Sequence, residues 1–200
     1  MKKIHLICNS HLDPVWMWDW EEGYGEAVST FHQAELFCQE FDFIFNHNEA
    51  VLYEFIEEHD PELFARIKEQ VKAGKWHIMG GWYLQPDCNM PSGEAFVRQI
   101  GLGRKYFAEK FDARPTTAIN FDSFGHSVGL VQILKKCGYE VDVIEFVDFA
   151  HSPKNLMLRC KMKKPLTPDL SDVKALTEKY GFTQKLYELV NEQSKSKAQS

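Results

Sequence analysis

The sequence predicts an α/β domain in which a parallel sheet is flanked by helices. Short apolar runs alternate with segments whose apolar residues recur at helical spacing. Each apolar run is also followed by a cluster of polar or aromatic residues. Parallel strands joined by right-handed crossovers bind ligands at their carboxyl ends, so the same pattern predicts where a site should lie.

Five strands are expected. The first is nearly all apolar, as a parallel strand buried on both faces requires. The third is ended by the pair Gly80-Gly81, and Pro115 breaks the chain before the fourth. The predicted strands are residues 4–9, 43–45, 76–79, 117–121 and 141–146.

Helices are expected between these strands, at residues 26–40, 49–58, 60–74, 92–110 and 128–137. The first places Ala27, Phe31 and Cys38 on one face. The third begins with the N-cap Asp60 and a proline at the first helical position, and it ends at Gly74 as C-cap. Ser92 caps the fourth helix.

The alternation of strand and helix stops near Phe146. We therefore expect two regions, an α/β domain over residues 1–146 and a divergent tail over residues 147–200. The tail is predicted to begin as a loop, to continue as one or two amphipathic helices over residues 171–192, and to end in disorder.

Composition excludes several classes of protein. A net charge of −6 provides no basic surface, so nucleic acid is not an expected partner. Five cysteines at irregular spacing, without a CxxC pair, indicate reduced thiols in a cytoplasmic protein. The apolar run after Lys3 is too short for a signal peptide, and no run approaches the about 20 residues that cross a membrane.

Unusual polar clusters stand at the predicted ends of four strands. They are His11 with Asp13, residues 46–49, residues 82–87, and residues 122–126. Because the carboxyl ends of parallel strands meet at one edge of a sheet, these clusters predict one shared site.

His11 and Asp13 are two residues apart, so on extended backbone their side chains point the same way. Imidazole nitrogen and carboxylate oxygen are ligands that zinc accepts, and Asp122 could complete a set of three. Asp122 could also serve as a nucleophile toward an anomeric carbon. The alternative is structural: His11 and Asp13 would cap a loop, and Asp122 would cap the following helix.

Three tryptophans, Trp16, Trp18 and Trp20, lie in the loop that carries His11. Flat aromatic faces stack on the C–H faces of sugar rings, which favours a carbohydrate-binding surface. Core and interface packing is the other interpretation.

Four motifs together resemble one family. They are His-Leu-Asp-Pro-Val-Trp at 11–16, Asn-His-Asn-Glu at 46–49, Gly-Gly-Trp at 80–82 and Asp-Ser-Phe-Gly-His-Ser at 122–127. Their order and spacing resemble the N-terminal catalytic part of a glycoside hydrolase family 38 α-mannosidase of the bacterial, cytosolic type. The resemblance covers residues 3 to about 139, and the family's usual proline is replaced by Ser123.

The resemblance implies a barrel-like (β/α) domain that hydrolyses terminal α-D-mannosyl residues with retention of configuration. One Zn²⁺ ion would be bound by His11, Asp13 and Asp122, and Asp122 would also be the nucleophile. Trp16 and Phe124 would line the subsite of the mannosyl ring. Trp82 and Asp87, from the third cluster, are assigned to the same substrate site.

The family also uses a fourth zinc ligand and a general acid/base from later segments, and no counterpart is evident in this chain. We therefore expect a truncated and catalytically incomplete α-mannosidase, whose open sheet edge could support self-association. The alternatives are a non-catalytic remnant that binds metal, sugar or a partner chain, and another metal-dependent carbohydrate hydrolase such as a deacetylase.

Overall fold

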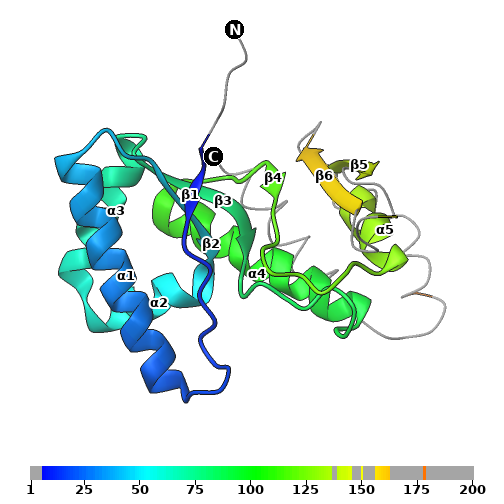
Figure 1. Ribbon diagram of the computed structural model, residues 1–200, viewed down its shortest axis with the longest axis horizontal. Coiled ribbons are helices and arrows are strands. Elements are labelled where there is room, and N and C mark those ends of the chain that lie inside the picture. The colour runs from blue at the N-terminus through cyan, green and yellow to red at the C-terminus, as the bar shows by residue number, and fades with distance from the viewer. Residues whose placement is uncertain (1–5, 137–138, 146–149, 151–155, 163–177, 179–200) are drawn as a thin grey trace, which may run out of the picture.

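A short parallel sheet forms the centre of the structure, a computed structural model that describes residues 6–136, 139–145, 150, 156–162 and 178 (Figure 1). Strand β2 (Phe45–Glu49) lies between β1 (Cys8–Asn9) and β3 (Trp76–Trp82), and both pairings are parallel. The predicted parallel arrangement of the first three strands is therefore confirmed. The first strand is shorter than predicted: β1 contains only Cys8 and Asn9, whereas Leu6 and Ile7 lie outside it and are 88% and 63% exposed. The prediction of a first strand buried on both faces is therefore wrong for these residues, and residues 4 and 5 lie outside the described part.

Five helices are described, close to their predicted positions: α1 (Trp20–Glu40), α2 (Ala50–His59), α3 (Pro61–Lys72), α4 (Gly93–Phe111) and α5 (Val128–Lys136). The side chain of Asp60 accepts a hydrogen bond from the Leu63 N–H and thereby caps α3, and Ser92 caps α4 in the same way. Helix α1 begins six residues before its predicted start at residue 26, within the tryptophan-rich segment.

The main core joins the sheet to helices α1–α3 and to Tyr106 and Phe107 of α4. Helices α1–α3 gather on one side of the molecule in Figure 1. Phe31 of α1 packs edge-on against Trp76 of β3, and Tyr53 of α2 completes the contact. The Trp76 indole donates to the Tyr53 hydroxyl at 2.8 Å. This fully buried aromatic cluster fixes β2 and β3 relative to the helices that precede and follow them.

The fourth and fifth strands correct the prediction of a single parallel sheet. β4 (Thr117–Ala118) and β5 (Tyr139–Glu145) lie in a second sheet, where both pair antiparallel with β6 (Leu156–Met162). Residues 139–143 alternate between apolar and acidic side chains, a pattern typical of an antiparallel strand with one covered face. Asp142 meets Arg159 across the ladder at 2.7 Å.

Strand β6 also differs from the predicted tail, which was expected to begin as a loop. The lysines and the proline near residues 161–165 favoured a loop, although residues 158–162 alternate between apolar and basic side chains as an antiparallel strand does. The described strands form two open sheets, so the implied barrel-like closure is not observed among them. The predicted amphipathic helix and disordered end lie outside the described residues, apart from residue 178.

Two strand ends also differ from the prediction. The polar residues 46–49 do not follow the second strand but form it, and all five residues of β2 are buried. The third strand continues through Gly80 and Gly81 to Trp82. In the described part of the chain, no helix combines the length and apolar character needed to cross a bilayer.

Helix α4 approaches β3 closely at Gly103, and this contact yields a testable pair of substitutions. A Cβ atom at Gly103 would overlap the Gly81 carbonyl oxygen and the Trp82 carbonyl carbon, whereas a Cβ atom at Gly101 would meet nothing within 4 Å. We expect Gly103→Ala to lower the free energy of unfolding by about 1–3 kcal/mol through overpacking. Gly101→Ala, the matched control in the same helix, should raise it by about 0.5–1 kcal/mol.

Urea denaturation followed by circular dichroism measures both effects. Equal effects of the two substitutions would contradict the inferred close approach of helix and strand.

Candidate active site

The side chains of His11, Asp13 and Asp122 meet at the surface, although they come from opposite ends of the domain's sequence. His11 Nε2 lies 3.4 Å from Asp13 Oδ1 and 3.9 Å from Asp122 Oδ2. The three side chains are 28%, 42% and 63% exposed, respectively. His11 and Asp13 follow β1, and Asp122 follows β4, so the predicted convergence of these two strand ends is present even though the strands belong to different sheets.

The loop that carries His11 is held against α1. The Trp18 indole N–H donates to the Asp13 carbonyl at 3.1 Å. Gly23 of α1 lies so close to the Pro14 carbonyl that a Cβ atom there would overlap it. The tryptophan-rich segment therefore leads directly into a helix packed on the core, which limits the freedom of the site loop.

Asp122 has an unusual backbone conformation, with φ at 48°. Few residues other than glycine adopt this left-handed region, and aspartate is among the more tolerant ones. The neighbouring Phe121 is held on both of its backbone groups by the side chain of Gln85. The site carboxylate is thus presented by a constrained backbone.

The buried residues His47 and Glu49 lie beneath this cluster. Glu49 Oε1 accepts the Gln85 backbone N–H at 3.0 Å, and Glu49 Oε2 lies 3.7 Å from His47 Nε2. His47 Nε2 has no hydrogen-bond partner within the described residues. His47 and Glu49 therefore form a buried base next to the site, with Glu49 only 2% exposed.

Burial perturbs both groups strongly. Loss of solvation raises the pKa of Glu49 to about 7, the hydrogen bond from Gln85 opposes this, and the Asp13 charge adds to it. Burial, with a smaller effect of His11, lowers the pKa of His47 to about 3. At neutral pH His47 is therefore uncharged and Glu49 is partly protonated, so the base of the site carries little charge.

The four residues predicted to contact the substrate differ in their surroundings. Trp16 and Phe124 each expose 60% of their surface on the loops that carry His11 and Asp122. Trp82 is 3% exposed, packs against Phe96 and donates its indole N–H to the Ile119 carbonyl at 2.6 Å, so its ring serves the core. Asp87 is exposed, and its Oδ1 accepts the Asn89 and Met90 N–H groups of its own loop.

The family model described as glycosyl hydrolases family 38 N-terminal domain matches residues 1–159 of this chain. This match covers most of the sequence and includes every strand end that contributes to the site. The chain belongs to this family. The match also extends beyond the boundary expected near residue 146 and includes part of β6.

Relatives of this family 38 chain agree with the match. It is 32% identical over 139 residues to alpha-mannosidase G of Dictyostelium discoideum, covering 69% of this chain and 13% of the relative. It is 34% identical over 136 residues to alpha-mannosidase 2C1 of Mus musculus, covering 68% of this chain and 13% of the relative. The chain therefore spans about an eighth of the length of these relatives.

A solved structure has the same fold over most of the chain. It is described as a protein in the glycosyl hydrolase family 38 from Enterococcus faecalis, with a TM-score of 0.56 at 16% identity. The similarity covers 88% of this chain and 22% of the other. It supports an α/β fold with a parallel sheet and helices.

The cluster of His11, Asp13 and Asp122 can be compared with the geometry of bound zinc. Tetrahedral zinc at about 2.0–2.2 Å from nitrogen and oxygen ligands holds those ligands about 3.3 Å apart. The His11–Asp13 distance of 3.4 Å agrees with this, while the His11–Asp122 distance of 3.9 Å is wider. Across the described residues, no group of three or more His, Cys, Asp or Glu side chains is already arranged to hold a metal ion.

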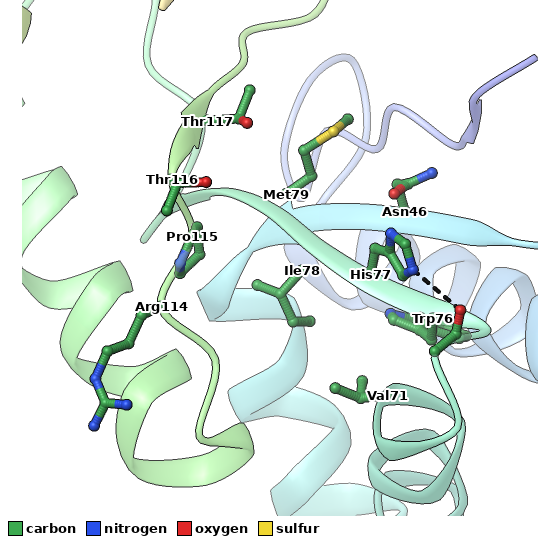
Figure 2. A pocket seen from close by; sticks show the side chains of 11 residues that line it. Asn46, Val71, Trp76, His77, Ile78, Met79, Arg114, Pro115, Thr116 and Thr117 are labelled. Atoms are coloured by element: carbon green, nitrogen blue, oxygen red, sulfur yellow. Dashed lines mark hydrogen bonds between the residues drawn. The ribbon is translucent and has the colours of Figure 1, made fainter. Parts of the chain in front are cut away.

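A pocket of about 420 Å³ lies elsewhere, beside the free edge of β3 (Figure 2). It is lined by Asn46, Val71, Gly74, residues 76–79 and residues 114–117. The His77 ring there is 3.0 Å from the Gly74 carbonyl oxygen. Asn46 belongs to the predicted polar cluster at 46–49, but none of the candidate ligand or sugar-contact residues lines this pocket, so it is separate from the cluster around His11.

The raised pKa of Glu49 predicts a pH-dependent stability. Its folded-state pKa of about 7 exceeds the model-compound value of 4.5, so between these pH values the folded chain binds more protons than the unfolded chain. Stability contributed by Glu49 is therefore present below pH 4.5 and is lost as pH rises to about 7. We expect Glu49→Gln to gain about 3 kcal/mol relative to wild type between pH 4.5 and pH 8.

Urea unfolding of both proteins across this pH range measures the difference. His47 contributes in the opposite direction, since its lowered pKa removes stability as pH falls below 6.5, and subtraction of the two curves removes that shared contribution. Parallel curves for variant and wild type would contradict the prediction.

Proposed function

We propose that this chain forms the zinc-binding and nucleophile-bearing part of a retaining α-mannosidase, which hydrolyses terminal α-D-mannosyl residues. The observation that carries the proposal is that carboxylate oxygens of Asp13 and Asp122 both lie within 3.9 Å of His11 Nε2. Family membership and relatives named alpha-mannosidase support the choice of substrate.

His11, Asp13 and Asp122 would hold one Zn²⁺ ion. When bound, the ion supplies a positive charge that can engage sugar hydroxyls and help to distort the ring. Asp122 is the proposed nucleophile, because it is the most exposed of the three side chains and is held on a constrained backbone. Attack by its carboxylate on the anomeric carbon would break the glycosidic bond, release the leaving alcohol and form a glycosyl-enzyme with inverted configuration. Attack by water on this intermediate would then release the carboxylate and invert the centre again, which gives net retention.

Trp16 and Phe124 are the proposed contacts for the mannosyl ring. Both are largely exposed, and they stand on the two loops that carry the metal-ligand candidates. Trp82 does not enter the proposal, because its ring is buried and its N–H is bonded to backbone. Asp87 is retained as a candidate polar contact at the rim, with one oxygen engaged in its own turn.

Retaining hydrolysis also requires a second carboxyl group that protonates the leaving oxygen. Glu49 has a raised pKa, but it is 2% exposed and bonded to Gln85, so it cannot reach a substrate at the surface. Within the described residues, the carboxylates that contact His11 are those of Asp13 and Asp122. We propose that this chain by itself binds zinc and mannoside without turning the substrate over.

A cytoplasmic location is part of the proposal. Cys8, Cys38, Cys88 and Cys160 carry free thiols, and unpaired cysteines are characteristic of a reducing compartment.

Zinc titration of the metal-free chain by calorimetry tests the proposed ligands. We expect the wild type to bind one zinc ion and His11→Ala or Asp122→Asn to weaken binding on the order of 100-fold. The first substitution removes a ligand, and the second replaces a charged oxygen ligand with a neutral amide. Asparagine tolerates the left-handed backbone of residue 122, so this variant should keep the fold. His32→Ala is the matched control, because that exposed histidine pairs with Asp60 instead. An equal loss of affinity in the control would refute the assignment.

Catalytic incompleteness is tested with an aryl α-mannoside and zinc. We expect no turnover by the chain, because a general acid is not present at the described site. Turnover that disappears in Asp122→Asn would support the nucleophile and overturn the inferred incompleteness.

A further inference from the structure

Gln85 contacts each of the segments that build the site. It belongs to the predicted polar cluster at residues 82–87, but the sequence did not single it out as a site residue. It lies in the loop that follows β3. Its backbone N–H donates to Glu49 of β2, and its side chain contacts Phe121 and His11. A single residue thereby connects β2, the loop after β1 and the segment that carries Asp122.

The contact with Phe121 has two parts. The Phe121 N–H donates to Gln85 Oε1 at 2.7 Å, and Gln85 Nε2 donates to the Phe121 carbonyl at 2.5 Å. The planar amide thus pairs with the backbone as a neighbouring strand would. Because the Phe121 N–H must face an acceptor, this pairing also fixes which end of the amide is oxygen and which is nitrogen.

The next residue along the chain is Asp122, whose positive φ requires support from its surroundings. A non-glycine residue in the left-handed region costs about 1 kcal/mol or more, and such a conformation persists where neighbours over-determine it. The paired amide holds the peptide groups directly before Asp122. It therefore acts on the direction of the carboxylate without touching a substrate.

The same amide reaches the other side of the site. Gln85 Nε2 is 3.5 Å from His11 Nδ1, the ring nitrogen that does not face the carboxylates. The Gln85 backbone is held in turn by Glu49, which is buried in the core sheet. Through Gln85, both His11 and the segment before Asp122 are therefore attached to the buried strand β2.

We propose that Gln85 is a positioning residue that sets the distance and orientation between Asp122 and His11. The inference rests on the proposed function, since it concerns the same metal ligands. It adds a residue that orients these ligands without binding the metal itself. Residues that orient metal ligands alter metal affinity by about 10–100-fold when they are removed.

Gln99 offers a matched control. Its Oε1 accepts the Leu84 N–H at 2.7 Å, so it holds the adjacent residue of the same loop. Within the described contacts it touches neither Phe121 nor His11. Gln85→Ala and Gln99→Ala thus each remove a glutamine that supports this loop, but only the first removes the bridge to the site.

The experiment compares the two variants by thermal unfolding, by amide hydrogen exchange of the metal-free chain and by zinc titration. In Gln85→Ala we expect the exchange of the Phe121 amide to rise at least about tenfold, because its acceptor is lost, and zinc affinity to fall about 10–100-fold. Both substitutions should lower the melting temperature to a similar extent, because each removes a hydrogen bond that supports the same loop. Gln99→Ala should leave the exchange rate of the Phe121 amide and the zinc affinity unchanged.

Unchanged Phe121 exchange in Gln85→Ala would overturn the inference, as would zinc affinity within twofold of wild type. An equal loss of zinc affinity in Gln99→Ala would show that Gln85 only supports the loop in general, and this result would also overturn the inference. If the wild type bound no zinc, the proposed function would fail, whereas the exchange comparison would still decide whether Gln85 holds the Phe121–Asp122 backbone.

Discussion

The parallel pairing of β2 with β1 and β3 is the constraint on which the site depends. It places the loop after β1 and the loop after β3 on either side of Glu49, at the last residue of β2. From there the Gln85 backbone and side chain extend the connection to Phe121. Asp122 belongs to a segment outside this sheet. Contacts of Trp82 with Ile119 and of Asn120 with Pro86 attach that segment to β3 and its loop, and the Gln85 side chain links it to His11.

The polar character of β2 reflects this role. A central strand is normally apolar, yet this one is Phe-Asn-His-Asn-Glu and is buried throughout. Burying such groups costs free energy unless they are hydrogen-bonded, and His47 Nε2 and Asn48 Nδ2 have no such partner among the described residues. Departures of this kind from the rules of a stable core concentrate at functional sites. Here they coincide with the strand that supports the candidate active site.

Much of the domain could be predicted because its signals are local. The caps at Asp60 and Ser92, the helical spacing in α1 and the apolar runs of β1 and β3 each depend on residues a few positions apart. The second sheet could not be predicted in this way. Whether residues 117–118 pair parallel with β3 or antiparallel with β6 depends on a strand nearly forty residues later. The alternation of apolar and basic residues at 158–162 is a local strand signal, but it does not reveal the partner strands.

The sequence by itself determined the family, the order of strands and helices as far as β4, and the identity of His11, Asp13 and Asp122 as ligand candidates. These conclusions follow from four short motifs whose residues, order and spacing together are typical of one family. Tertiary structure alone decided which neighbours act on these groups. Trp82 became a core residue because α4 and Ile119 enclose it, and Glu49 gained a raised pKa because the fold buries it. Gln85 emerged as the link between strand ends because its partners are 36 and 74 positions away, beyond the reach of any local pattern.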